Sequence, residues 1–465
     1  MTAPQPLSAP LSEFVAGTRY EDLPAQTIHM AKRCLLDAIG VSLAASGLGE
    51  GCRAFIDLAM EQGGRPTCTV FGMDQRVPVE AAAFCNGALA HAMDYEDAHD
   101  GTLLHPNAQS IPAALAIAEA LGPATGRDLI SAIAVGCEVA VRMGLALRAS
   151  MSDYGWYPPP ILAAFGATAA ASRLLHLGAR QTRDALSLTL CQATCSGEIK
   201  YSPDSVMRAV RDAFGARAAV TSALLAARGV TGFDLPLEGQ AGFFAMFARG
   251  AYEPSAILRD LGRSFEIDNI SLKPWPSCRG THAAIQGIVE LRAEHGLPST
   301  DVQRIELHGG RILRMLDEPL ATKRHPATAI DAKFSLPFVC ASALIHGRVT
   351  IDSFSAAALQ APETLRIAQK VSLVVDQDLP ENSIGTKIVI ATCRGTRHEL
   401  DVSFPLGHPR NPMTEDASIG KFMDCARYAA NPTDESLARR ISEIVLRLEL
   451  LEDVGSQLMP LLRGG

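Results

Sequence analysis

The stretch Gly126-Arg-Asp-Leu-Ile-Ser-Ala-Ile-Ala-Val-Gly-Cys-Glu-Val-Ala-Val-Arg-Met-Gly-Leu-Ala-Leu-Arg148 shows which architecture the chain adopts. Its apolar residues recur at spacings of three and four, which is the period of a helix. The Gly-Arg-Asp triplet at its beginning is a plausible helix start. The same pattern predicts further helices at Pro24 to Ala45, Pro78 to Ala92, Ile111 to Leu121, Ile161 to Leu177, Gln181 to Cys195 and Arg217 to Arg228. Residues from Leu11 to about Gly250 are therefore predicted to form an all-helical domain.

The pattern changes after about Leu261, where short segments rich in β-branched residues appear. These predicted strands are Gln303 to His308, Lys370 to Val375, Thr386 to Thr392 and His398 to Phe404, with helices between them at Thr281 to His295 and Phe338 to His346. Strands and helices mixed in this way are typical of a small α+β domain.

The tail from Pro412 to Leu462 returns to the helical pattern, so the smaller domain is predicted to be inserted into the helical one. The expected fold is mainly α, with a large all-helical domain and an inserted α/β lid domain. Its expected divisions are residues 1–265 and 406–465 for the helical domain and 266–405 for the lid.

The composition excludes some classes of partner. A net charge of −8 and the lack of a basic stripe argue against nucleic acid. The eleven cysteines are dispersed without CxxC spacing, as expected of reduced thiols in a cytoplasmic protein. No export signal and no long uninterrupted apolar run is visible, so we expect no membrane partner. The apolar surplus, 48% of residues, suits an oligomer interface, and a homodimer is the default expectation.

A second stretch suggests chemistry: His91-Ala-Met-Asp94-Tyr-Glu-Asp97-Ala-His99-Asp-Gly-Thr-Leu-Leu-His105-Pro106 carries three imidazoles and four carboxylates. Such a helix end can supply both a general acid and a general base. Asp94, three residues after His91, is expected on the same helical face. The alternative is a solvated acidic helix end.

The sequence lacks the motifs of several other kinds of site. The histidines and aspartates of this stretch match neither HExxH nor zinc-finger spacing, so no metal is expected. The chain has no GxGxxG after a strand, no Walker A sequence and no GxSxG motif, which argues against nucleotide cofactors and a serine nucleophile. No cofactor of any kind is expected.

Several blocks together resemble the MmgE/PrpD family over nearly the whole chain. They are Ala31 to Ala44, Asp94 to Pro106, Leu224 to Gly232, Leu237 to Gly239, Lys273 to His282, Asp331 to Phe338 and Gly407 to Met413. The resemblance implies a large helical domain, a smaller α/β lid, a dimer, and a metal-free site between the domains. It also implies chemistry next to a carboxylate, such as dehydration, decarboxylation or epimerisation.

Three residues match functional positions of the family. Asp94 matches its helix aspartate and is expected to take part in acid/base catalysis. His105 matches its active-site histidine, and an imidazole suits proton transfer in either direction. Lys273 matches a lysine beside the substrate, where an ammonium can hold a carboxylate or a developing enediolate.

Other positions depart from the decarboxylase and methylcitrate dehydratase pattern. Tyr157 stands where those enzymes have a histidine, and Cys278 lies closest to a second one. Ala98 replaces a hydroxyl residue. A family lysine becomes Arg208, although Arg211 fits the loose alignment as well. A phenol and a thiol titrate well above an imidazole, so the available proton transfers change.

These observations predict a cofactor-independent lyase of the dehydratase type that acts on a small di- or tricarboxylate by general acid/base catalysis. The expected catalytic residues are Asp94, His105, Lys273, Tyr157 and Cys278, and the expected substrate-binding residues are Arg208, Arg279 and Asp97. Two alternatives stay open: an epimerase of the iminodisuccinate type, with Cys278 as one of two bases, and a non-catalytic homodimer that binds carboxylates.

Overall fold

The computed structural model describes residues 6–202, 205–380 and 382–463. Within these residues the chain divides into two compact units. The first is helical and comprises Met1–Tyr201, Val206–Ile270 and Thr414–Gly465, and the second consists mainly of Ser271–Met413. The first unit is thus interrupted by the second, as the helical tail of the sequence predicts. The predicted fold class, mainly α with a smaller α+β part, is confirmed.

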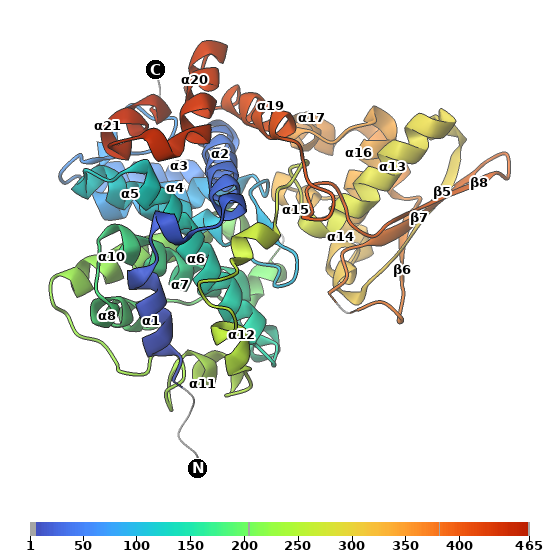
Figure 1. The fold of residues 1–465 in the computed structure, drawn as a ribbon. Coiled ribbons are helices and arrows are strands. Elements are labelled where there is room, and N and C mark those ends of the chain that lie inside the picture. The colour runs from blue at the N-terminus through green and yellow to red at the C-terminus, as the bar shows by residue number, and fades with distance from the viewer. Residues whose placement is uncertain (1–5, 203–204, 381, 464–465) are drawn as a thin grey trace. The chain divides into compact units, whose positions relative to one another are not determined.

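Four long helices form the centre of the helical unit: α5 (Asn107–Leu121), α6 (Gly126–Ala146), α7 (Pro158–Leu174) and α10 (Asp212–Ala227). Of these, α5 and α10 pack against α4 (Val79–Ala92), and α7 packs against α5, α6 and α10, in the helical region that Figure 1 shows. Glycines allow α6 and α7 to approach each other, because a Cβ added to Gly166 would lie 2.4 Å from the backbone oxygen of Gly136. The predicted start of α6 is confirmed: Thr125 caps it and accepts a hydrogen bond from the backbone of Asp128.

Helix α6 is also long and apolar enough to cross a membrane by length and composition alone. In this structure 89% of its most apolar window is buried, and it packs against α5, α7 and α12 (Pro254–Leu258). A helix that is apolar on all sides is expected in the core of a large protein. We therefore describe α6 as a core helix.

The main hydrophobic core of the helical unit combines residues that are distant in sequence. Leu104, Val139 and Phe165 meet a group of phenylalanines from α11 (Phe243–Ala248). The rings of Phe165 and Phe243 lie edge to face, with centroids 5.1 Å apart. This packing anchors the end of the loop that precedes α5, because Leu104 is fully buried in the same cluster.

The C-terminal segment completes the helical unit. Helix α19 (Glu415–Ala426) and helix α20 (Glu435–Leu446) both pack on α2 (Ala25–Leu48). A Cβ on Gly40 of α2 would lie 3.0 Å from the Phe422 ring of α19, so the contact between these helices is tight. The remaining helices of this unit are α1 (Ser8–Gly17), α3 (Cys52–Gln62), α8 (Ala179–Leu190), α9 (Met207–Val210) and α21 (Val454–Gln457).

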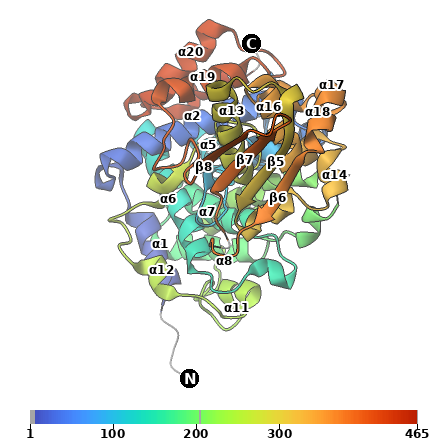
Figure 2. The same ribbon diagram turned by 90° about the vertical axis from the view of Figure 1, so that its right-hand side faces the viewer.

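The second unit is built on a four-stranded sheet in the order β6-β5-β7-β8. Its strands are β6 (Val371–Val375), β5 (Val302–Gly309), β7 (Thr386–Thr392) and β8 (Arg397–Val402), so the four predicted strands are confirmed. Strands β5 and β6 are parallel, whereas β5 and β7, and β7 and β8, are antiparallel. Helices α13 (His282–His295) and α16 (Leu336–His346) pack together beside this sheet, as Figure 2 shows.

Shorter elements complete the described chain. The short strands are β1 (Cys68–Thr69), β2 (Arg76–Val77), β3 (Ala98–His99) and β4 (Ile270–Ser271). The short helices of the second unit are α14 (Leu320–Arg324), α15 (Ala329–Lys333), α17 (Ala356–Leu359) and α18 (Pro362–Ala368).

Candidate active site

The functional stretch begins where helix α4 ends. The helix stops at Ala92, and Asp94 has a φ angle of 47°, in the left-handed region that non-glycine residues rarely adopt. The prediction that Asp94 shares a helical face with His91 is therefore wrong, because the backbone has already left the helix. The turn nevertheless keeps both side chains fully buried. Strained backbone of this kind clusters at active sites, ligand clamps and switch regions.

The loop from Ala98 to His105 returns the chain to the same place. The backbone N–H of His99 donates to the oxygen of Leu104, and the N–H of Leu103 donates to the oxygen of His99, each at 2.8 Å. The His99 ring lies 2.9 Å from the hydroxyl of Thr102 and 3.5 Å from Glu266. These bonds close the loop, and His105 lies at its end, just before helix α5 begins.

Four side chains converge at this point: His91, Asp94, Glu96 and His105 each place one polar atom within 4.8 Å of the others. The Glu96 Oε1 atom lies 2.5 Å from His91 Nδ1 and 2.9 Å from His105 Nδ1. The two imidazole rings are tilted by 58°, with centroids 5.1 Å apart. A single carboxylate oxygen therefore lies between two imidazoles.

Hydrogen bonding assigns the tautomer of His105. Its Nδ1 lies 2.9 Å from the backbone oxygen of Asp97, which can only accept a hydrogen bond. Nδ1 must therefore carry the proton, and Nε2 is the nitrogen that can exchange one. The His105 side chain is 14% exposed, whereas that of His91 is fully buried, so His105 is the more accessible imidazole.

Burial controls the charge of the surrounding groups. It lowers the pKa of His91, and the nearby positive charge of Arg211 lowers it further, although Glu96 acts in the opposite direction. Burial also raises the pKa of Asp97 to about 7. A hydrogen bond of 2.5 Å from the Asn107 amide to the Asp97 carboxylate acts in the opposite direction and lowers this pKa, but burial has the larger effect. We accordingly treat His91 as neutral near pH 7 and Asp97 as a group that titrates there.

These four side chains could in principle hold a metal ion. A tetrahedral ion with ligands at ~2.0 Å requires them to be roughly 3.3 Å apart. Glu96 Oε1 lies closer than that to both imidazole nitrogens, at hydrogen-bonding distance. The arrangement suits proton sharing better than metal coordination, so a metal-free site remains our expectation.

A positively charged corner surrounds Tyr157. The guanidinium of Arg211 lies 5.0 Å and the ammonium of Lys200 5.5 Å from the centre of its ring. Burial lowers the pKa of Arg211, but the negative groups near it, Asp94, Glu96 and Asp212 among them, outweigh burial and raise it overall. Arg211 is thus a fixed cation beside several carboxylates and the phenol.

Arg208 belongs to the same corner. Its backbone oxygen accepts a hydrogen bond of 2.8 Å from Arg211. The pKa of Lys200 is lowered by burial and then by the positive charge of Arg208. Arg211 therefore lies beside Tyr157 and contacts Arg208, and Arg211 is the more deeply buried of these two arginines.

The other three predicted site residues, Lys273, Cys278 and Arg279, belong to the second unit. Lys273 is fully buried, and Cys278 is partly exposed. The Arg279 guanidinium donates to the backbone oxygens of Leu406 and Pro405 and to the Ser271 hydroxyl. These bonds tie the Arg279 side chain to other segments of its own unit.

Comparison with known proteins supplies the family. The model of the MmgE/PrpD N-terminal domain matches residues 9–255, and the model of the C-terminal domain matches residues 275–450. The chain belongs to the MmgE/PrpD family.

Relatives of this MmgE/PrpD protein have names of carboxylate-acting enzymes. It is 29% identical to the cis-aconitate decarboxylase-like protein oryM of Aspergillus oryzae, over 98% of this chain and 97% of the relative. It is also 29% identical to cis-aconitate decarboxylase of Homo sapiens, over 97% and 93%. Mitochondrial 2-methylcitrate dehydratase of Yarrowia lipolytica is 25% identical over 82% and 76%. The chain is thus a member of a family of lyases and dehydratases that act on carboxylates.

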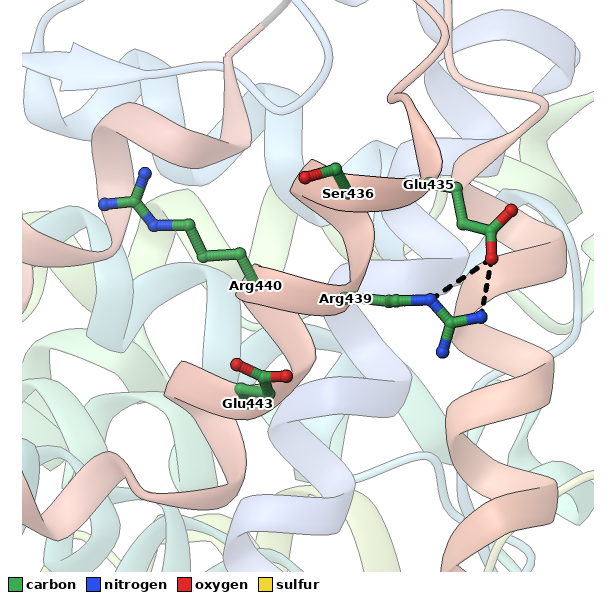
Figure 3. Close-up of a pocket in the computed structure, with 5 residues that line it drawn as sticks. All are labelled: Glu435, Ser436, Arg439, Arg440 and Glu443. Atoms are coloured by element: carbon green, nitrogen blue, oxygen red, sulfur yellow. Dashed lines mark hydrogen bonds and ion pairs between the residues drawn. The ribbon is translucent and has the colours of Figure 1, made fainter.

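A surface depression of this MmgE/PrpD chain lies away from these groups. It is lined by Glu435, Ser436, Arg439, Arg440 and Glu443 of α20, as Figure 3 shows. Arg439 and Glu435, one helical turn apart, form an ion pair there. Exposed pairs of this kind are typical of a solvated helix face, so we assign no chemistry to this depression.

The sequence did not single out three residues that the structure brings into or beside the candidate site: His91, Glu96 and Lys200. His91 and Glu96 stood inside the functional stretch, but spacing alone does not show that both imidazoles meet one carboxylate. Lys200 is one of only eight lysines in the chain, and this scarcity is a signal that could have drawn attention to it.

Proposed function

We propose that this protein is a cofactor-independent lyase of the dehydratase type, which moves a proton next to a carboxylate of a small di- or tricarboxylate. The observation that carries the proposal is the geometry of His105. Its Nδ1–H is held by the backbone oxygen of Asp97, which leaves Nε2 as the atom that takes or returns a proton. The names of the relatives support a carboxylate substrate of this size.

The proposed reaction begins with removal of a proton from the carbon beside a substrate carboxylate by His105 Nε2. The electron pair of the C–H bond moves into the carboxylate and forms an enediolate. A hydroxide then leaves from the neighbouring carbon, takes a proton from a general acid, and departs as water, so that an alkene forms. Asp94 or Tyr157 is the proposed acid, and Arg211 and Lys273 are proposed to stabilise negative charge.

The second candidate is an epimerase. Here the proton removed from one face of the carbon is replaced by a proton on the opposite face, and nothing else leaves. Two departures from the histidine pattern favour this candidate, the phenol of Tyr157 and the partly exposed thiol of Cys278. A thiol that donates a proton and a histidine that accepts one would form such a pair.

Proton NMR of the purified protein in D₂O tests the proposal, with citrate, 2-methylcitrate, cis-aconitate, iminodisuccinate, malate and tartrate as substrates. A new alkene or hydrated product, with deuterium at the carbon beside a carboxylate, is the result expected of a lyase. Deuterium exchange with inversion and no change of composition identifies the epimerase. Binding of an acid without any exchange would replace both enzymes with a non-catalytic carboxylate-binding protein.

A further inference from the structure

Glu96 is the residue that the two imidazoles of the site share. Its side chain is 2% exposed, and its Oε1 atom lies at hydrogen-bonding distance from Nδ1 of both His91 and His105. The backbone conformation explains why this is possible. Glu96 follows the left-handed turn at Asp94 by two residues, so its side chain returns toward the end of α4, from which His91 comes.

The two contacts of His105 have different consequences. The backbone oxygen of Asp97 already requires a proton on Nδ1 of His105. Because this carbonyl carries no net charge, it stabilises a positively charged ring only weakly. Glu96 adds a negative charge at 2.9 Å from the same nitrogen. When Nε2 takes a proton from the substrate, the ring becomes an imidazolium, and a buried anion at this distance stabilises it.

The polar and charged groups around Glu96 come from three parts of the helical unit and bear on that effect. His91 comes from α4, Asp94 and the Asp97 carbonyl come from the loop, and Arg211 and Asp212 lie at the start of α10. The Asp212 Oδ2 atom is 3.9 Å from His91 Nδ1. The Arg211 cation acts on His91 and is itself stabilised by Glu96. Without the negative charge of Glu96, the positive charge of Arg211 would disfavour protonation of the nearby imidazole of His91 more strongly.

We infer that Glu96 is a positioning residue for proton transfer: its carboxylate, which is hydrogen-bonded to His91, lies at ion-pair distance from His105 and stabilises the protonated ring of His105. This inference rests on the proposed role of His105. The proton that Nε2 receives stays on His105 until it is returned, and Glu96 gives up or takes up no proton in the step.

The test compares Glu96→Gln with the wild type and with Glu119→Gln. Glu119 is a suitable control because it is also a buried carboxylate, bonded to Thr69 and Arg76 instead of to the site. For Glu96→Gln we expect kcat to fall by ~10² with little change in KM, because the lost interaction forms only when the ring is charged. The acid limb of its pH–rate profile should move to lower pH. Glu119→Gln should change neither.

A second readout does not depend on turnover. The ¹⁵N signals of the two rings, assigned with His91→Gln and His105→Asn, are followed against pH in the full chain. We expect a coupled titration of both rings in the wild type and, in Glu96→Gln, independent titrations with that of His105 at lower pH. Glu96→Asp keeps the negative charge and should restore part of the wild-type titration behaviour. This variant also tests the inference if Glu96→Gln does not fold.

The outcomes separate this inference from the proposed function. Unchanged kcat and unchanged titrations in Glu96→Gln overturn the inference and leave the role of His105 intact. A lower kcat with unmoved titrations also overturns it, because Glu96 would then only support the fold. Full activity in His105→Asn overturns the proposed function, whatever the titrations of Glu96→Gln show.

Discussion

The ammonium of Lys421 on helix α19 donates a hydrogen bond of 2.6 Å to the backbone oxygen of Tyr95, which lies 326 residues earlier in the chain. The same ammonium forms an ion pair of 2.6 Å with Asp37 of α2 and lies over the Tyr95 ring. Helix α19, which lies far later in the sequence, therefore holds the turn that follows Asp94 in place.

Replacing Lys421 with Met should destabilise the protein by ~3–5 kcal/mol, because it removes one partner of a buried ion pair and leaves the charge of Asp37 less well compensated. The side chains of this pair are only 4% and 5% exposed. Urea unfolding measures the change. The matched control is Lys32→Met, which breaks the more exposed pair with Glu449 and should cost ~1 kcal/mol or less. Equal losses in the two variants would show that the buried pair has no special role.

Replacing His105 with Asn should lower turnover by ~10² or more and change substrate binding little, because the amide fits the space but cannot take a proton at neutral pH. Steady-state kinetics and a direct binding measurement separate the two effects. The control is His176→Asn, since His176 lies at an exposed turn after α7. Normal turnover in His105→Asn would remove this residue from the mechanism.

Replacing Tyr157 with Phe should lower kcat by ~10-fold or more if the phenol serves as an acid, with a smaller effect on KM. The ring itself remains, so its contacts with Arg211 and Lys200 are kept. Tyr201→Phe is the control, because Tyr201 is 73% exposed. A rise in KM alone would instead assign the Tyr157 hydroxyl to substrate binding.

Asp97 should make stability depend on pH in a defined direction. Burial raises its pKa to about 7 in the folded protein, against ~3.9 in an unfolded chain. Between these values the folded state keeps a proton that the unfolded state has lost. The free energy of unfolding therefore falls as the pH rises from about 4 to about 7, by up to about 4 kcal/mol, and levels off above.

Asp97→Asn removes this contribution, so the variant should gain stability relative to the wild type between pH 5 and pH 8. Urea unfolding of the variant and the wild type at pH 5 and at pH 8 measures the difference between their free energies of unfolding. The comparison also cancels the similar contribution of Glu138, whose pKa burial raises to about 7 in both proteins. The exposed carboxyl of Asp424 provides the control through Asp424→Asn. A constant difference across this range would mean that Asp97 is ionised throughout.

Removal of metal ions should leave activity unchanged. Glu96 Oε1 lies too close to both imidazole nitrogens for all three atoms to be ligands of one tetrahedral ion. Dialysis against EDTA followed by the D₂O exchange assay is the measurement. Loss of activity that returns with added Zn²⁺ or Mn²⁺ would instead make His91, Asp94, Glu96 and His105 a metal centre.

Local sequence determined most of the secondary structure. The period of three and four predicted α6 from its first residue, because Thr125 and Asp128 form a cap within four residues of each other. The run of β-branched residues predicted β7 with both ends correct. The change between these two periods also showed that the second unit interrupts the first. Each of these signals acts between residues close together in the chain.

The arrangement of the site was decided by the tertiary structure. The left-handed turn at Asp94, the carboxylate of Glu96 between two imidazoles, and the bond from Lys421 to Tyr95 have no signature in spacing. The physical reason is that burial and contacts between distant segments set these features. A short-range pattern can place a histidine and an aspartate on one stretch of chain. Only the packed fold decides which nitrogen carries the proton and which charge lies beside it.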